Sequence, residues 1–171
     1  KVVKLKTMAE TLLFIQKHDF ADFDALADYA DAASSRTKEL TAKIKAAESR
    51  MAEIAVLKTH IINYAKTRDI YTAYRKAGYS RKYYDAHESD ITIHKAAKKT
   101  FDDLALKKLP TVKSLQAEYS DLLVQKKLDY AALAKAREEA RQLQIYKANT
   151  EMLLRTDADE QRQTREHQQE K

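Results

Sequence analysis

Apolar residues recur at three- and four-residue spacing along most of the chain, which is the pattern of amphipathic helices. Residues 1–18 contain the first run and predict a short lead-in helix. The second run extends from about residue 22 to residue 77 without a helix breaker, so it predicts one helix of roughly 55 residues. Two polar residues, Thr37 and Arg68, fall on the predicted buried face of this helix. The other residues of that face are Phe23, Leu26, Ala30, Ala33, Leu40, Ile44, Ala47, Met51, Ile54, Leu57, Ile61, Tyr64 and Tyr71.

The single glycine and the single proline divide the rest of the chain into two further predicted helices, at about 80–106 and 111–155. Gly78 suits the residue after a helix end because glycine takes positive φ without steric cost. Pro110 cannot continue a helix, because its ring clashes with the preceding turn. The predicted caps of the helices that follow residues 18, 78 and 110 are Asp19 or Asp22, Ser80 and Thr111.

The two later helices also show one apolar face each. In the third helix this face consists of Tyr83, Ala86, Ile93, Ala97, Phe101 and Leu104. In the last helix it consists of Leu115, Tyr119, Leu122, Leu133, Ala140 and Leu143, with Lys126 and Asp129 as interruptions. Short connections make sequential helices antiparallel neighbours. We therefore predict an all-α fold over residues 19–156, an elongated antiparallel helical hairpin or three-helix bundle with long coiled-coil-like helices, followed by a polar tail over 157–171 that is disordered or a frayed helix end.

Composition supports the helical prediction and narrows the location of the protein. One glycine, one proline and 34% charged residues leave little material for sheets and tight turns. The absence of cysteine excludes disulfides and thiolate metal sites and is typical of the cytoplasm. No apolar run reaches the length of about 18 residues that a membrane span needs, so we expect no membrane insertion. Because the chain begins with Lys1 rather than methionine, we expect it to be a piece of a longer protein.

Charge is distributed unevenly and defines a candidate site. Residues 58–99 contain ten Lys or Arg against four Asp or Glu. The segments before and after this one are each neutral, so residues 58–99 carry the whole net charge of +6. They also contain six of the ten tyrosines. Cations offset phosphates and aromatic rings stack on bases, so this combination is typical of nucleic-acid binding. The candidate nucleic-acid or partner-binding residues are Arg68, Tyr74, Arg75, Lys76, Tyr79, Arg81, Lys82, Tyr84, Lys95, Lys98 and Lys99.

A structural interpretation of the same residues stays open. Tyr64, Tyr71 and Tyr83 follow the three- and four-residue spacing of the predicted buried faces. They can lie at the edge of the core with their hydroxyls in contact with water. Arg75 and Lys76 are favourable at a helix C-terminus because of the helix dipole, and any of the cations can be solvated surface. Arg81 and Lys82 lie in a first helical turn, where positive charge is mildly unfavourable, so their presence favours a role in binding.

Catalytic interpretations find little support. His87 and His94 share a helix face, but about 10 Å of rise separates them, which is too far for two ligands of one metal. Tyr83 or Tyr84 could attack DNA as a nucleophile, yet nothing in the sequence supplies the metal or base that this would require. One glycine cannot build a phosphate-binding loop. We expect no metal, no cofactor and no enzymatic activity in this chain.

The amino-acid sequence resembles a known protein family over most of its length. The stretches "AVLKTHIINYAKTRDIYTAYRKAGYSRKYYDAHESDITIHKAAKKTFDDL" and "KKLPTVKSLQAEYSDLL" resemble the C-terminal region of relaxases, the mobilisation nucleases of conjugative and mobilisable elements from Gram-positive gut bacteria. The likeness extends from "KVVKLKTMAETLLF" to "KANTEMLLR". Relaxases nick one DNA strand with an N-terminal tyrosine and histidine-held metal. No residue of that site matches here, and the resemblance places it before Lys1.

The resemblance implies a non-catalytic accessory region of a DNA-nicking relaxase. Its implied partners are DNA, single-stranded DNA included, or proteins of the relaxosome and secretion channel, contacted through the basic tyrosine-rich residues during mobilisation. The alternative from the residues alone is a structural coiled-coil spacer or dimerisation arm that binds no nucleic acid, because narrow alanine-rich seams can pair with a second copy.

Overall fold

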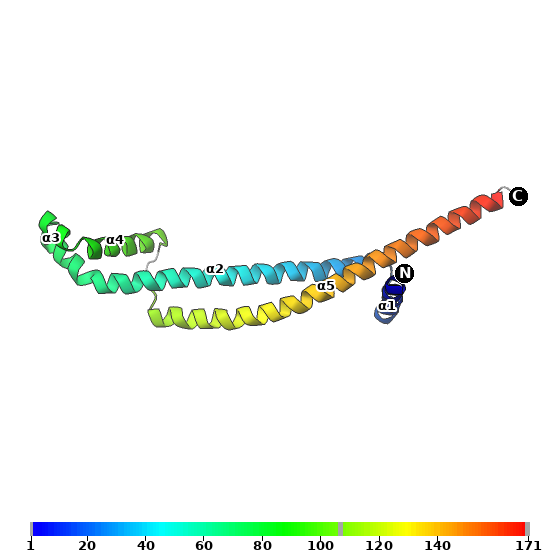
Figure 1. Cartoon of the computed structure of the whole chain (residues 1–171), viewed down its shortest axis with the longest axis horizontal. Helices are drawn as coiled ribbons and strands as arrows, with labels where there is room; N and C mark the ends of the chain where they lie inside the picture. Colours follow the sequence, from blue (N-terminus) through cyan, green and yellow to red (C-terminus); the bar gives the residue numbers. More distant parts are fainter. Residues whose placement is uncertain (1, 106–107, 170–171) are drawn as a thin grey trace. The chain divides into compact units, whose positions relative to one another are not determined.

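The computed structural model describes residues 2–105 and 108–169, and this part of the chain contains helices and no strand. The predicted all-α fold is confirmed. In chain order the helices are α1 (Val2–His18), α2 (Phe23–Lys76), α3 (Arg81–Ala86), α4 (Glu88–Asp103) and α5 (Val112–Gln169) (Figure 1). The Asp22 carboxylate accepts a hydrogen bond from the Ala25 N–H (2.9 Å) and the Thr111 hydroxyl accepts one from the Ser114 N–H (3.0 Å), so both residues cap as predicted.

Two predicted helix boundaries differ from the structure. The helix expected over 80–106 is broken at His87, whose φ of −133° and ψ of 28° are not helical, into α3 and α4. Its predicted end at residue 106 lies outside the described residues. The predicted polar tail over 157–171 is helical up to Gln169, because α5 continues to that residue. The Gln, Glu and Arg residues that made the tail look featureless are also good helix formers.

The chain forms two compact units, and unit 1 extends to Lys43 and resumes at Leu128. It contains α1, the first part of α2 and the later part of α5. Its buried apolar residues are Leu26, Ala30, Leu133, Ala136, Ala140 and Leu143. Helix α1 is joined to α5 by a hydrogen bond from the Asn149 side chain to the buried Thr11 hydroxyl (2.9 Å) and by Phe14 stacked on Tyr146.

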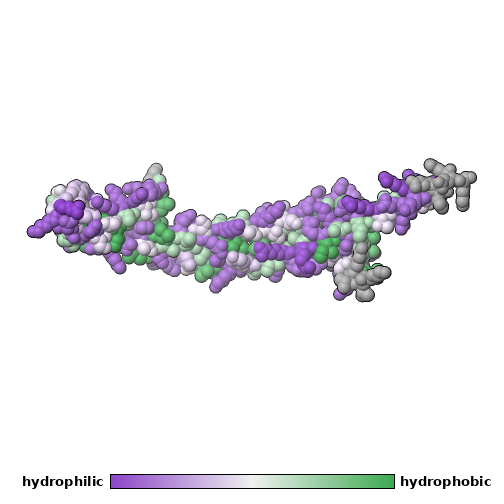
Figure 2. Space-filling view, turned by 45° about the horizontal axis from the view of Figure 1, so that its top comes forward, coloured by the Kyte–Doolittle hydropathy of each residue, from purple (hydrophilic) through white to green (hydrophobic). Residues whose placement is uncertain are grey.

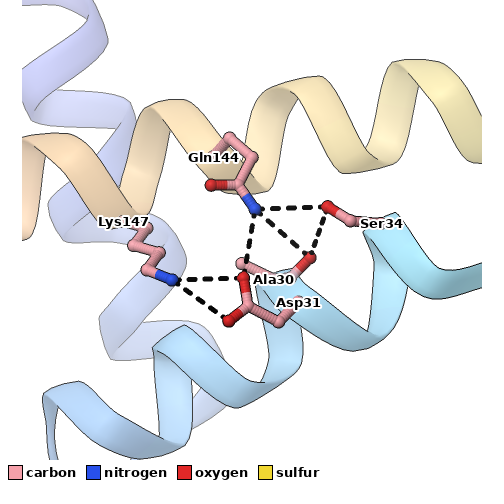
Figure 3. A network of polar contacts seen from close by, with 5 residues as sticks. All are labelled: Ala30, Asp31, Ser34, Gln144 and Lys147. Carbon is pink, nitrogen blue, oxygen red and sulfur yellow. Dashed lines mark hydrogen bonds and ion pairs between the residues drawn. The ribbon is translucent and has the colours of Figure 1, made fainter.

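A polar network joins α2 to α5 within unit 1 (Figure 3). The Lys147 ammonium donates to both Asp31 carboxylate oxygens, at 3.1 and 3.3 Å. The Gln144 amide donates to the Ser34 hydroxyl at 3.2 Å and lies near the Ala30 carbonyl. These contacts lower the pKa of Asp31, chiefly through the hydrogen bond from Lys147. The pairing of residues near 31 with residues near 147 fixes the two helices as antiparallel neighbours here.

Unit 2 spans Ile44–Lys127 and contains the later part of α2, all of α3 and α4, and the beginning of α5. Its core is one cluster in which three helices meet: Ile54 and Leu57 from α2, Ala97 and Phe101 from α4, and Leu115 from α5. A bidentate pair between Arg50 and Glu118, with N–O distances of 2.7 and 3.1 Å, again joins α2 to α5. Helices α4 and α5 therefore both pack on α2 in this unit.

The buried faces follow the sequence prediction in outline and depart from it around α4. Thr67, 4% exposed, occupies the buried position where the spacing predicted Arg68, which is exposed. On α4 the buried residue is Ile91, not the predicted Ile93, which is 37% exposed. Ala86 and Leu104 are exposed as well. The predicted Ala97 and Phe101 are buried, so the predicted face of α4 is correct at these two positions and wrong at Ile93 and Leu104.

Candidate nucleic-acid interface

The corner after α2 is closed by backbone hydrogen bonds of the Schellman type. The Tyr79 N–H donates to the Tyr74 carbonyl and the Gly78 N–H donates to the Arg75 carbonyl, both at 3.0 Å. Gly78 has a φ of +61°, as its predicted place after the helix end requires. Tyr79 has the same positive φ, which is uncommon for a residue with a side chain. The corner is therefore a tightly held turn that presents Tyr79 and the flanking cations.

Replacing Gly78 with alanine is expected to lower the free energy of unfolding by about 1 kcal/mol. A Cβ at this position would meet no atom within 4 Å, so the cost comes from the positive φ alone. Asparagine tolerates this conformation better than alanine, so Gly78→Asn should lose less. Urea unfolding of both variants measures the difference, and an equal loss in the two would show that strain at φ is not its source.

Tyr74 lies at the centre of a tyrosine cluster. It is 8% exposed, and its ring centroid lies 5.2 Å from that of Tyr79, 6.0 Å from Tyr84, 6.2 Å from Tyr71 and 6.4 Å from Tyr83. A buried ring cannot offer its face to a base. Tyr74, a predicted binding residue, therefore supports the rings around it instead of reaching a ligand itself.

Two of the predicted cations are already engaged with rings of this cluster. The Lys95 ammonium lies 5.8 Å from the Tyr74 ring centroid and 5.7 Å from that of Tyr84, which brings α4 to the corner. The Arg81 guanidinium lies 5.6 Å from the Tyr84 centroid and 2.8 Å from the Asp85 carboxylate. Arg81 thus has local partners that its place in a first helical turn did not indicate, although an exposed pair of this kind contributes little stability.

The remaining predicted cations are exposed, and in the described part of the chain none of their side chains forms an ion pair. They come from α2, α3 and α4, and they are Arg68, Arg75, Lys76, Lys82, Lys98 and Lys99. Hydrophilic residues cover the surface around α3 at the left of Figure 2. Cations that no carboxylate neutralises are free to bind an anionic partner.

His94 is the residue of this region that the sequence analysis did not select. It is 3% exposed, and its ring stacks between Tyr64 and Tyr71 at centroid distances of 4.3 and 4.2 Å. Its Nδ1 lies 3.0 Å from the Thr67 hydroxyl. Burial, with a smaller contribution from the Lys98 charge, lowers the pKa of His94. This contact holds α4, and with it Lys95 and Lys98, against α2.

The burial of His94 could have been predicted from its spacing relative to other residues of α4. Ile91, His94 and Ala97 follow one another at three-residue spacing, and all three are buried. Since His94 also lies close to three full helical turns after Tyr83, helical spacing alone could have placed the imidazole on the buried face.

Comparison with known proteins found no family model, no curated protein and no solved structure that matches the chain. Over residues 2–105 and 108–169, no three histidine, cysteine, aspartate or glutamate side chains are grouped so that they could hold a metal ion. None of the helices described has the length and apolar character that crossing a membrane requires.

Proposed function

We propose that the corner between α2 and α4 binds nucleic acid, and that the chain is a non-catalytic accessory region of a cytoplasmic DNA-nicking relaxase. The observation that carries the proposal is a group of exposed cations that form no ion pair within the described part of the chain, in the same segment as a cluster of tyrosines. Phosphate contacts of this kind supply affinity without reading sequence. The assignment to a relaxase is supported by the resemblance of the amino-acid sequence to the C-terminal region of relaxases.

Replacing Arg75, Lys76, Arg81 and Lys82 together with glutamine is expected to weaken DNA binding for unrelated sequences alike. Each phosphate contact contributes roughly 0.7 to 0.9 to the slope of log K against log salt, so the slope should fall by up to about 3. Fluorescence anisotropy of labelled DNA at about 50 and 200 mM salt measures both affinity and slope.

A matched control removes the same charge elsewhere. Arg36, Lys38, Lys43 and Lys45 are exposed residues of α2 outside the basic segment. Their replacement with glutamine should leave the slope near that of the unmodified chain, because only long-range attraction is lost. Equal losses in the two quadruple variants would show that net charge, and not the corner, attracts DNA. Unchanged affinity in the corner variant would refute the proposal.

The second candidate function is a dimerisation arm, which α1 favours. Leu5, Leu12 and Leu13 of this helix are 71%, 55% and 65% exposed, so α1 presents apolar side chains that a second copy of the chain could cover. Sedimentation over a range of concentrations separates the two functions. A dimer that binds no DNA at low salt supports the arm, and a monomer that binds DNA supports the nucleic-acid interface.

A further inference from the structure

Tyr79 differs from the other tyrosines of the basic segment in having an open ring. It is 57% exposed, whereas Tyr74 beneath it is buried. The two rings meet edge to face, with 85° between their planes, so the contact does not stack a ring on Tyr79. A Schellman turn commonly includes an apolar contact between these two positions, which explains why the ring is near Tyr74. It does not explain why more than half of the residue remains in solvent.

The other tyrosines of the segment already have partners at ring-stacking or cation distance. Tyr64 and Tyr71 stack on His94. Tyr83 packs on His87 with a centroid distance of 4.5 Å, and Tyr84 has both Arg81 and Lys95 near its ring. Among the described residues, neither a ring stacked on Tyr79 nor a cation over its ring is found, which distinguishes it from the other tyrosines of the segment.

The backbone of Tyr79 is held in a conformation that has an energetic cost. A positive φ is unfavourable for a residue with a bulky side chain, and the hydrogen bond from the Tyr79 N–H to the Tyr74 carbonyl fixes it there. Such local strain is concentrated at functional sites. A residue whose backbone is already fixed loses little further backbone entropy when a ligand stacks on its ring.

We infer that Tyr79 is the stacking platform for one unpaired base, so that the corner binds single-stranded nucleic acid in preference to duplex. This inference rests on the proposed function. Inside a duplex each base is already stacked on both sides, so only an unpaired base can lie on the ring. Arg75 and Lys76 precede the platform and Arg81 and Lys82 follow it, where they can reach the phosphates on either side of that base.

The test compares three labelled probes of equal length: oligo(dT), a strand of abasic sites that keeps the phosphates, and a duplex. The unmodified chain should bind oligo(dT) about 5- to 100-fold more tightly than the abasic strand. Tyr79→Ala should lose that advantage and leave abasic and duplex binding unchanged, while Tyr79→Phe should retain it. Oligo(rU) run beside oligo(dT) assigns the strand as RNA or DNA, and the inference fails when Tyr79 contributes to neither.

Two controls keep the result interpretable. Tyr79→Leu preserves an apolar contact with Tyr74 but has no ring, so it should behave as Tyr79→Ala if stacking is the cause. Tyr130, 48% exposed in unit 1, is a tyrosine outside the basic segment, and Tyr130→Ala should bind as the unmodified chain does. If the corner glutamine variant loses binding while Tyr79→Ala retains the oligo(dT) advantage, this inference fails and the proposed function stands. If the glutamine variant binds normally, both fail.

Discussion

Replacing Ile54 with alanine should lower the free energy of unfolding by about 2 to 5 kcal/mol. Ile54 is fully buried in the cluster where α2, α4 and α5 meet, which also contains Phe101 and Leu115. Truncation removes three carbons from this cluster and leaves a cavity that long, regular helices cannot readily collapse into. The midpoint of urea unfolding, followed by the helical circular dichroism signal, should shift to clearly lower denaturant.

Val56 supplies the matched control for this variant. It lies two residues away on the same helix and is 54% exposed. Val56→Ala should change stability by about 0.5 kcal/mol or less, because little apolar surface is lost and alanine is the better helix former. Similar losses in the two variants would mean that the cluster is not a packed core, and the placement of α4 on α2 would then be wrong.

The helices of this chain were predictable because few residues compete with helix formation. The end of α2 before Gly78 follows from the φ of glycine, and the start of α5 after Pro110 follows from the inability of proline to continue a helix; in the structure α2 ends at Lys76 and α5 begins at Val112. The break at His87 was not predictable, because no breaker marks it. The backbone of His87 is not helical, and nothing in the neighbouring sequence indicates this.

The candidate site was predictable as a charge pattern and not as a geometry. Counting cations found the segment, but it could not distinguish Tyr74, which is buried, from Tyr79, which is 57% exposed. Nor did it show that Arg81 has Asp85 and Tyr84 as partners. Both distinctions depend on which neighbours α3 and α4 bring to the end of α2, and those neighbours come from residues up to 21 positions apart, as Lys95 and Tyr74 do.

His94 is placed so that acid should weaken unit 2. The Thr67 hydroxyl donates its hydrogen to the Asn63 carbonyl at 2.7 Å, so it can only accept from His94, whose Nδ1 must therefore carry the proton. The groups that face the ring are Tyr64, Thr67 and Tyr71 from α2 and Lys98 from its own helix, and none of them is a carboxylate. A second proton on the imidazole is thus opposed by burial and by a neighbouring cation.

The sign of the effect follows from the lowered pKa. Because the folded state binds the proton less readily than the unfolded state, the stabilisation is fully present above the ordinary value of 6.5 and is lost as pH falls from there through the folded pKa. The loss can reach about 1.4 kcal/mol per pH unit within that window. The pKa values of Asp31 and Glu118 are lowered from 3.8 and 4.5, so their contributions are lost at more acidic pH and do not obscure it.

Two variants should separate the titration of His94 from its packing. His94→Phe keeps a ring between Tyr64 and Tyr71 and leaves the Thr67 hydroxyl bonded to Asn63, so it should stay within about 1.5 kcal/mol of the unmodified chain near pH 7.5 and lose less stability between about pH 6.5 and 5. His94→Ala removes the ring and should lose about 2 to 4 kcal/mol near pH 7.5, and its deficit relative to the unmodified chain should shrink as pH falls, because the alanine has no proton to bind. Urea unfolding across the range, with the imidazole titration followed by NMR, measures both effects. Parallel pH profiles for the unmodified chain and His94→Phe would contradict the prediction, because the ring would then be protonated as easily in the folded chain as in the unfolded one.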